Sequence, residues 1–224
     1  MTTIAIVGAG RGLGAAVARK FGSEGFDIAL ISRSQERLDA LATDLEAEGL
    51  AARGYAANVR EPKSLIAALD RAGQELSPIE VLQYSPLPQK EFLRPVLETT
   101  VDDLAGAIEF AVYGPVVAVH QVLQGMRFLG RGTILFVNGG SGAVPNPNVA
   151  GTSIAFAGES AFARMLHDTL KAENIGVGQL IIPGAIEPGH PDNDPAVLAG
   201  KLWHLHAHPG EFRVHSDARP DGQR

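Results

Sequence analysis

A glycine-rich run near the N-terminus has the residue types and spacing that bind phosphate groups. Residues 8–14 read Gly-Ala-Gly-Arg-Gly-Leu-Gly, directly after an apolar stretch and directly before an Ala-rich helical pattern. Glycines let the backbone turn tightly and approach a pyrophosphate, while free N–H groups and the dipole at a helix start favour negative charge. Many loops carry glycines only in order to turn, and that is the alternative. The position between a strand and a helix predicts a dinucleotide site formed by Gly8, Gly10, Arg11, Gly12, Leu13 and Gly14.

The end of the second expected strand indicates which dinucleotide is bound. Folds that prefer the unphosphorylated cofactor place an acid there to bond the ribose 2′-hydroxyl. Here the strand ends Ile31-Ser32-Arg33, with a guanidinium and no carboxylate. Arg33, with Arg11 as a second contact, would match a 2′-phosphate. The sequence favours NADP(H) over NAD(H), with Ser32 and Arg33 in the site; the alternative is that both arginines are solvated surface residues.

The elements that would position these residues alternate along the chain. Apolar β-branched runs at 3–7, 27–31, 51–56, 79–84, 133–137 and 176–182 are expected strands. Helix-period segments at 13–22, 35–48, 62–76, 100–128 and 153–171 lie between them. A parallel sheet with crossover helices needs this alternation. We expect an α/β fold with one doubly wound Rossmann-type sheet, strand order 3-2-1-4-5-6 and a possible seventh strand.

Length and composition limit the classes of protein. The 224 residues are 45% hydrophobic and 20% charged, which suits one globular domain spanning 1–224. A formal net charge of −6 argues against nucleic acid or an anionic membrane as the main partner. The absence of Cys excludes disulfides, thiolate zinc sites and cysteine nucleophiles. We find no pattern of a secretory signal or a membrane span, and therefore expect a cytoplasmic domain.

The C-terminal part of the sequence differs from the rest. Prolines and glycines break residues 185–215 into short pieces around an expected helix at 196–206, which we interpret as a substrate loop or lid with Trp203 as its apolar anchor. Residues 216–224 are polar and expected to fray. His190 is a candidate substrate contact or an exposed loop residue. No carboxylate completes a metal site, so we expect no metal, although this region holds five of the seven histidines: His190, His204, His206, His208 and His215.

The pattern over residues 1–185 resembles the short-chain dehydrogenase/reductase family. The resemblance rests on the glycine spacing, on Asn58-Val59 after the third strand and on Pro183-Gly184 after the sixth. It implies that Asn58 and Val59 lie against the adenine, that Pro183 and Gly184 lie near the nicotinamide, and that Ser85 follows the fourth strand beside the cofactor. It also implies a homodimer or homotetramer formed through the long helices at 100–128 and 153–171.

The catalytic residues that the resemblance implies are missing. The family transfers a hydride between NAD(P)(H) and a carbonyl or alcohol with a Tyr, a Lys four residues later, a Ser and an Asn. No Tyr in this chain is followed by Lys at that spacing. Tyr84 and Tyr113 could face the crevice and supply a proton, or pack as ordinary core rings; Ser141 could polarise a substrate oxygen, or cap its loop. The four family positions hold Ala111, Gly139, Thr152 and Phe156.

Two functions follow from this pattern. The first is an NADP(H)-dependent oxidoreductase that acts on a small carbonyl or alcohol with a non-standard proton source such as Tyr84, Tyr113, His190 or water. The second is a catalytically silent relative that binds NADP(H) as a sensor or partner subunit. A fold that no longer binds any cofactor is a third option. The sequence does not identify a substrate, because the expected pocket walls at 87–98 and 186–208 are the least patterned segments.

Overall fold

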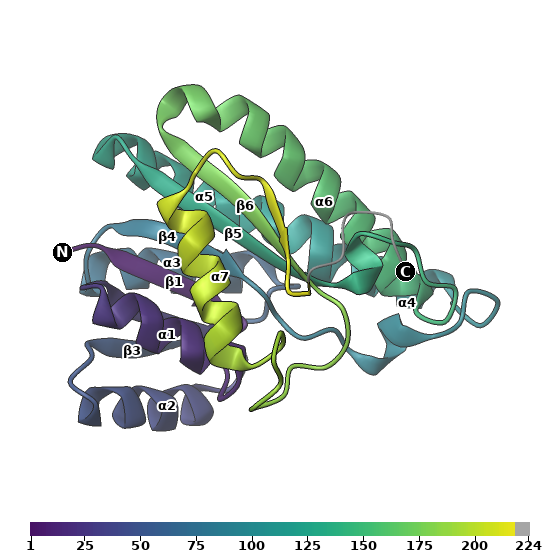
Figure 1. Ribbon diagram of the computed structural model, residues 1–224, viewed down its shortest axis with the longest axis horizontal. Helices are drawn as coiled ribbons and strands as arrows, with labels where there is room; N and C mark the ends of the chain where they lie inside the picture. The colour runs from purple at the N-terminus through teal and green to yellow at the C-terminus, as the bar shows by residue number, and fades with distance from the viewer. Residues whose placement is uncertain (218–224) are drawn as a thin grey trace.

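The computed structural model describes residues 1–217 and contains one parallel sheet flanked by helices (Figure 1). Its order is β3-β2-β1-β4-β5-β6-β7, and every neighbouring pair is parallel. The α/β prediction is therefore confirmed, and the seventh strand is present. The strands are β1 Thr3–Val7, β2 Asp27–Ser32, β3 Ala52–Ala56, β4 Ile79–Tyr84, β5 Gly132–Gly139, β6 Ile175–Ile182 and β7 Arg213–His215.

The crossover helices agree with the sequence pattern except between β4 and β5. They are α1 Leu13–Ser23, α2 Gln35–Ala47, α3 Pro62–Glu75, α4 Val101–Ile108, α5 Gly114–Leu129, α6 Ala150–Leu170 and α7 Pro195–Ala207. Short helical turns lie at η1 Lys90–Leu93, η2 Glu109–Tyr113, η3 Gly140–Gly142 and η4 Lys171–Glu173.

The expectation of one uninterrupted α-helix over 100–128 is wrong. A π-helical turn, η2, separates α4 from α5. Pro115 follows this turn and has no N–H to bond the carbonyl of Ala111, and its ring would crowd that carbonyl in a regular helix. The carbonyl of Phe110 accepts a hydrogen bond of 2.6 Å from the Tyr84 hydroxyl instead. The π turn therefore has a local cause in the sequence.

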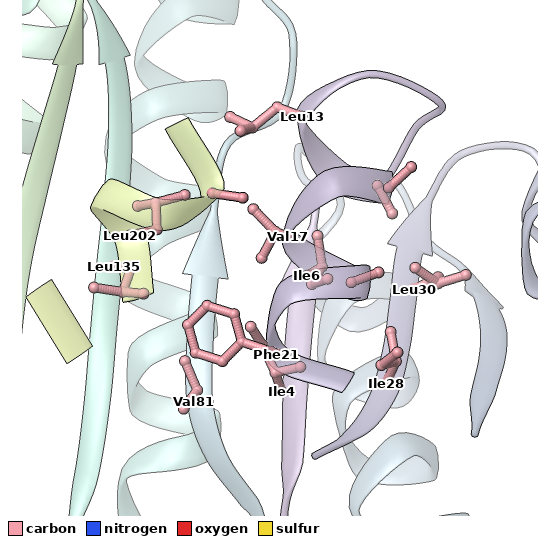
Figure 2. Close-up of a cluster of buried hydrophobic side chains, with 14 of the residues drawn as sticks. Ile4, Ile6, Leu13, Val17, Phe21, Ile28, Leu30, Val81, Leu135 and Leu202 are labelled. Atoms are coloured by element: carbon pink, nitrogen blue, oxygen red, sulfur yellow. The ribbon is translucent and has the colours of Figure 1, made fainter. Parts of the chain in front are cut away.

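Apolar side chains cover both faces of the sheet, which explains the continuous apolar strands. Ile4 and Ile6 of β1 point to one face, while Ala5 and Val7 point to the other. On the first face, Phe21 of α1 packs among side chains of the central strands and of α7 (Figure 2). Helices α3, α5 and α6 cover the second face. The strands are thereby fixed between two cores, and their carboxyl ends are left to form a site.

Helix α7 belongs to the first of these cores. It runs beside α1 (Figure 1), and its residues Leu198, Leu202 and Leu205 are buried. Trp203 packs edge-on against Phe21, with ring centroids 5.1 Å apart. The expectation that Trp203 anchors a lid over the substrate is wrong, because the helix uses its apolar face to cover the sheet. Of the expected lid 185–215, the loop before α7, the first residue of α7 and the end of β7 reach the cleft described below.

The end of the described chain is ordered against the sheet. Ser216 is buried, and its N–H donates to the Ile181 carbonyl at 2.8 Å. The expectation of fraying from residue 216 is therefore wrong at Ser216, while residues 218–224 lie outside the described residues.

One run of the described residues is long and apolar enough by composition to cross a membrane. It spans Val101–Leu129, and half of its most apolar window is buried inside the fold. Ala118, Val119, Val122 and Met126 of this run pack in the second core. Core packing therefore accounts for much of its apolar character.

Replacement of Leu202 by Ala tests whether α7 is part of the core. Leu202 is fully buried, so Leu202→Ala should lower the free energy of unfolding by about 2–5 kcal/mol. The measurement is urea unfolding followed by circular dichroism. Val197→Ala on the exposed side of the same helix should change stability by about 0.5 kcal/mol or less. Equal stability of Leu202→Ala and wild type would mean that α7 is a detachable lid.

Candidate functional site

A cleft of about 1210 Å³ lies at the carboxyl ends of the strands. The strand order reverses between β1 and β4, and crossover connections diverge on either side of that point. Open α/β sheets bind ligands in the crevice that this divergence leaves. The residues from the predicted cofactor site that line it are Gly8, Gly10, Arg11, Gly12, Leu13, Gly14, Ser85, Pro183 and Gly184.

The glycines of the first loop have two different physical roles. Gly8 has φ +97°, and a Cβ there would lie 2.5 Å from the Pro86 nitrogen. A Cβ at Gly14 would lie 2.9 Å from the Ala9 Cα, so this glycine permits close packing of helix on loop. Gly10 and Gly12 face open space instead. These two positions leave room for a ligand against the backbone.

The N-terminus of α1 has free donors at this open loop. No side chain caps the helix, and its first turn contains no acidic residue. Unpaired N–H groups and the helix dipole favour an anion there. The loop therefore has the space and the donors that a pyrophosphate needs, and the dinucleotide site stays a prediction.

The residues predicted for the adenosine end lie beyond the lining of the cleft. Arg33 is exposed after β2, and Ser32 is half-buried at the end of that strand. Asn58 follows β3 and donates to the Glu61 carboxylate at 2.8 Å. Val59 comes directly after it. Because β1, β2 and β3 are adjacent and parallel, these four residues continue the edge that the glycine loop begins.

Arg11 lines the mouth of the cleft with its side chain largely exposed. It forms an ion pair of 3.1 Å with Asp44 of α2. A 2′-phosphate would have to compete with that carboxylate for the Arg11 guanidinium.

The opposite end of the cleft is shaped by the loop after β6. Gly184 has φ +88° and lies beside Pro183. The Asn193 side chain donates to the carbonyls of Pro183 at 2.8 Å and Ala185 at 3.1 Å. Asn193 fixes the Pro-Gly turn, a role that sequence reasoning missed because nothing in the local pattern pairs this amide with carbonyls ten and eight residues earlier.

Three of the four residues that the resemblance implies at catalytic positions line the cleft. Gly139, Thr152 and Phe156 do so, whereas Ala111 is buried in the π turn. Ser141 also lines it and donates to the Thr152 hydroxyl oxygen at 3.4 Å. Thr152 in turn donates to a backbone carbonyl one turn earlier at 3.1 Å. The structure thus places two hydroxyl groups beside each other in the cleft.

Neither tyrosine predicted as a proton source lines the cleft. Tyr84 is 1% exposed, and its hydroxyl donates to the Phe110 carbonyl inside the core. Burial raises the pKa of Tyr84 well above its ordinary value, which makes the phenol a poor acid. Tyr113 lies on η2 with 58% of its surface exposed. The expectation that these phenols face the crevice is wrong, because Tyr84 fills the space under the π turn.

The histidines of the C-terminal segment lie at several separate places in the structure. His190 lies beside the main cleft in a pocket of about 290 Å³, where its Nδ1 accepts two backbone N–H groups. His204 contacts Glu211 at 2.8 Å on the surface. His206 contacts the Thr133 hydroxyl, and burial lowers the pKa of His206. Within residues 1–217, no group of three or more His, Asp or Glu side chains could hold a metal.

His215 is the histidine that lines the cleft, and sequence reasoning did not single it out. It lies on β7 opposite Ile181. Asp217 lines the cleft two residues later. A strand of three residues is too short to show a periodic pattern, so only the pairing of β7 with β6 identifies His215 as a site residue.

A buried polar network supports the floor of the cleft. Asn138, which lines the cleft, donates to Glu159 of α6 at 3.0 Å and accepts from Gln179 of β6 at 2.7 Å. Gln179 also donates to Ser160, whose hydroxyl donates to the Gly142 carbonyl. Burial raises the pKa of Glu159 to about 8. The carboxyl is therefore protonated at neutral pH. Sequence reasoning did not identify Glu159 as part of the site, although a Glu on an apolar helix face was a signal for a buried carboxyl.

The stability of the protein should fall with pH because of Glu159. The unfolded chain releases this proton near pH 4.5 and the folded chain near pH 8, so the contribution of Glu159 to stability is fully present below pH 4.5 and declines up to pH 8. The slope is at most about 1.4 kcal/mol per pH unit. Glu159→Gln replaces the ionisable carboxyl by a neutral amide. The stability of this variant relative to wild type should therefore rise from pH 4.5 to 8 and level off above pH 8. Urea unfolding at pH 5, 6.5 and 8 measures the difference.

The control is Glu46→Gln, at an exposed position on α2. It should leave the pH slope unchanged. A constant difference between Glu159→Gln and wild type from pH 5 to 8 would mean that Glu159 ionises in the fold as it does in water.

Comparison with known proteins identifies the same family that the sequence pattern resembles. The family model described as "short chain dehydrogenase" matches residues 2–195. The chain is 29% identical over 184 residues to 2,3-dihydro-2,3-dihydroxybenzoate dehydrogenase of Bacillus subtilis, which covers 81% of this chain and 69% of that enzyme. For two further relatives the matched segment spans less than two thirds of their length, 62% and 57%.

Solved structures give the same result over nearly the whole chain. A short-chain dehydrogenase from Rhodopseudomonas palustris has a TM-score of 0.82 at 28% identity, covering 98% of each chain. A metagenomic short-chain oxidoreductase in complex with NADP has a TM-score of 0.82 at 21% identity, covering 96% of each chain. At that identity the second similarity shows the fold alone.

Proposed function

This chain belongs to the short-chain dehydrogenase family, and from that premise we propose that it binds NADP(H) and transfers a hydride between this cofactor and a carbonyl or alcohol. The observation that carries the proposal is the glycine loop. Gly10 and Gly12 leave open space beside the uncapped start of α1, which suits a pyrophosphate. We place the activity in a cytoplasmic domain.

Charge at the end of β2 supports the phosphorylated cofactor. Arg33 is exposed there, and the sequence from 31 to 33 contains no carboxylate that would repel a 2′-phosphate. The oxidoreductase named above as similar was solved in complex with NADP. Both observations agree with the preference for NADP(H).

The chain's own residues would orient the reaction. The bound nicotinamide supplies or accepts the hydride. Pro183 and Gly184 would hold the nicotinamide end, because the Asn193 side chain fixes the turn through the carbonyls of Pro183 and Ala185. Ser141 and Thr152 would donate hydrogen bonds to the substrate oxygen and stabilise the negative charge that develops on it, after giving up their present acceptors.

His215 is our choice for the proton source. In reduction the hydride adds to the carbonyl carbon, and the oxygen must receive a proton. A hydroxyl polarises this oxygen but is a weak acid, whereas imidazole exchanges protons near neutral pH. Among the described residues that line the cleft, His215 is the one imidazole. This assignment replaces Tyr84 and Tyr113, neither of which lines the cleft.

The second candidate function is a silent NADP(H)-binding sensor or partner subunit. It is favoured by Phe156, which stands in the cleft where the family has a Lys and packs near Phe110 with ring centroids 6.4 Å apart. An apolar ring cannot lower the pKa of a nearby acid as an ammonium does. Turnover of NADPH with any carbonyl distinguishes the two candidates.

A homodimer or homotetramer through residues 100–128 and 153–171 belongs to the same proposal. Large apolar side chains are exposed on the helices of these two segments, which is the surface a second copy would cover. They are Val101, Tyr113, Phe128, Ile154 and Met165.

Titration calorimetry with NADPH and NADH tests the cofactor assignment. Wild type should bind NADPH more tightly than NADH. Arg33→Ala removes the charge opposite the 2′-phosphate, so it should weaken NADPH binding by about tenfold or more while leaving NADH binding unchanged.

Two glycine variants serve as controls for that titration. Gly12→Asp puts a side chain and a negative charge into the open space of the loop, and should abolish binding of both cofactors. Gly200→Asp, at an exposed position on α7 that also faces open space, should bind like wild type. Equal affinity of wild type for both cofactors would contradict the preference, and absence of binding would contradict the function.

Removal of His215 tests the proton source. With a panel of aliphatic and aromatic aldehydes and ketones, His215→Ala should lower kcat for NADPH oxidation by about 10²–10⁴-fold, because a positioned general acid is lost. NADPH affinity should be unchanged. Added imidazole should restore part of the rate, which a merely structural defect would not allow.

His120→Ala, at an exposed position on α5, is the matched control and should keep the wild-type rate. A His215→Ala rate equal to wild type would show that the proton comes from elsewhere. No turnover by wild type on any carbonyl, with NADPH bound, would favour the silent candidate.

A further inference from the structure

Large apolar side chains make up a substantial part of the lining of the cleft. The side chains come from three separate loops and from α6. We name as the apolar wall the residues Leu87, Leu93, Val144, Pro147, Phe156 and Ile186, all of which line the cleft. These residues come from distant parts of the sequence and meet in one cleft.

Several members of the apolar wall are unusually exposed for large apolar side chains. Leu87 is 84% exposed, and Leu93 and Ile186 are also exposed. Singly exposed apolar residues are common on proteins, but several around one cleft mark a surface that a ligand covers. Burial of each Å² of this surface would contribute about 25 cal/mol. The wall therefore favours a ligand that is itself apolar.

Backbone hydrogen bonds hold the loops of the wall together. Val96 donates to the Pro147 carbonyl at 2.8 Å, and Ala150 donates to the Arg94 carbonyl at 2.9 Å. The Arg94 side chain forms an ion pair with Asp103 at 3.3 Å. The segment after β4 and the segment before α6 are thus joined into one surface that exists before a ligand binds, which lowers the entropy cost of binding.

Few ionisable side chains line the cleft, and none of them belongs to the apolar wall. Among the described lining residues, the ionisable side chains are Arg11, His215 and Asp217. Arg11 belongs to the glycine loop and is paired with Asp44. Phe156 stands where the family has its Lys, so the wall has lost a positive charge there. A carboxylate or phosphate of a substrate would lose its water at the wall without gaining a cation, which is costly.

From these observations we propose that the cleft takes an uncharged, largely apolar carbonyl compound or its alcohol, bound with its hydrocarbon part against the apolar wall. This inference rests on the proposed function, because it assigns the substrate class of the same site. It excludes sugars, polyols and anionic carbonyl compounds as preferred substrates.

A matched pair of aromatic ketones tests the proposal by binding alone. 2-Acetylnaphthalene and 6-acetyl-2-naphthoate share one ring system and differ by a carboxylate. Calorimetric titration of each into wild type, with and without saturating NADP⁺, should give a Kd for the neutral ketone at least tenfold lower than for the anion. Glyceraldehyde, a small polar carbonyl compound, should bind more weakly than the neutral ketone.

Two aspartate variants locate the binding surface. Leu87→Asp puts a charge into the apolar wall and should raise the Kd of 2-acetylnaphthalene at least tenfold. Leu97→Asp is the matched control, because Leu97 is 97% exposed a few residues further along but does not line the cleft. It should bind like wild type. Unchanged NADPH affinity in both variants shows that they fold.

The proposal is overturned if the anion or glyceraldehyde binds as tightly as the neutral ketone, if no ketone binds, or if Leu87→Asp and Leu97→Asp behave alike. Failure of the proposed function is a different result. In that case wild type binds no NADPH, while the titrations without cofactor still report whether the wall takes the neutral ketone.

Discussion

The close approach of two loops at the centre of the sheet is the constraint on which the functional edge depends. Gly8 has a positive φ and faces the Pro86 backbone, with no room for a side chain. The N–H groups of Gly8 and Ala9 both donate to the Ile31 carbonyl, at 2.8 and 3.0 Å. One loop is thereby tied to the ends of β1, β2 and β4. Because the connections diverge here, the cleft opens beside the start of α1.

The two ends of the cleft depend on different interactions. The glycine loop offers backbone N–H groups, which persist whatever the neighbouring side chains are. The proposed substrate end depends on side chains, among them Thr152 and Phe156. Its floor is nevertheless fixed by the buried network of Asn138, Glu159 and Gln179. Both ends of the cleft are therefore held by interactions within the protein itself.

The apolar ring of Phe156 and the scarcity of ionisable side chains in the cleft have the same physical consequence. Both lower the polarity at the place where the substrate would lie, and both strengthen the electrostatic effect of the few polar groups that face it. The hydroxyls of Ser141 and Thr152 and the imidazole of His215 are three such groups. A dry cleft with few donors suits a neutral substrate whose only polar atom is the oxygen that reacts.

Periodic patterns and turn chemistry in the sequence were enough to predict the sheet, its parallel crossovers and the glycine loop, because these depend on local spacing and on backbone conformation. The positions of Tyr84, Trp203 and His215 were not predictable in this way. Tyr84 is buried under a π turn, Trp203 packs on α1, and His215 reaches the cleft through a three-residue strand. Contacts between residues distant in sequence decide where each of these side chains points, and only the tertiary structure supplies them.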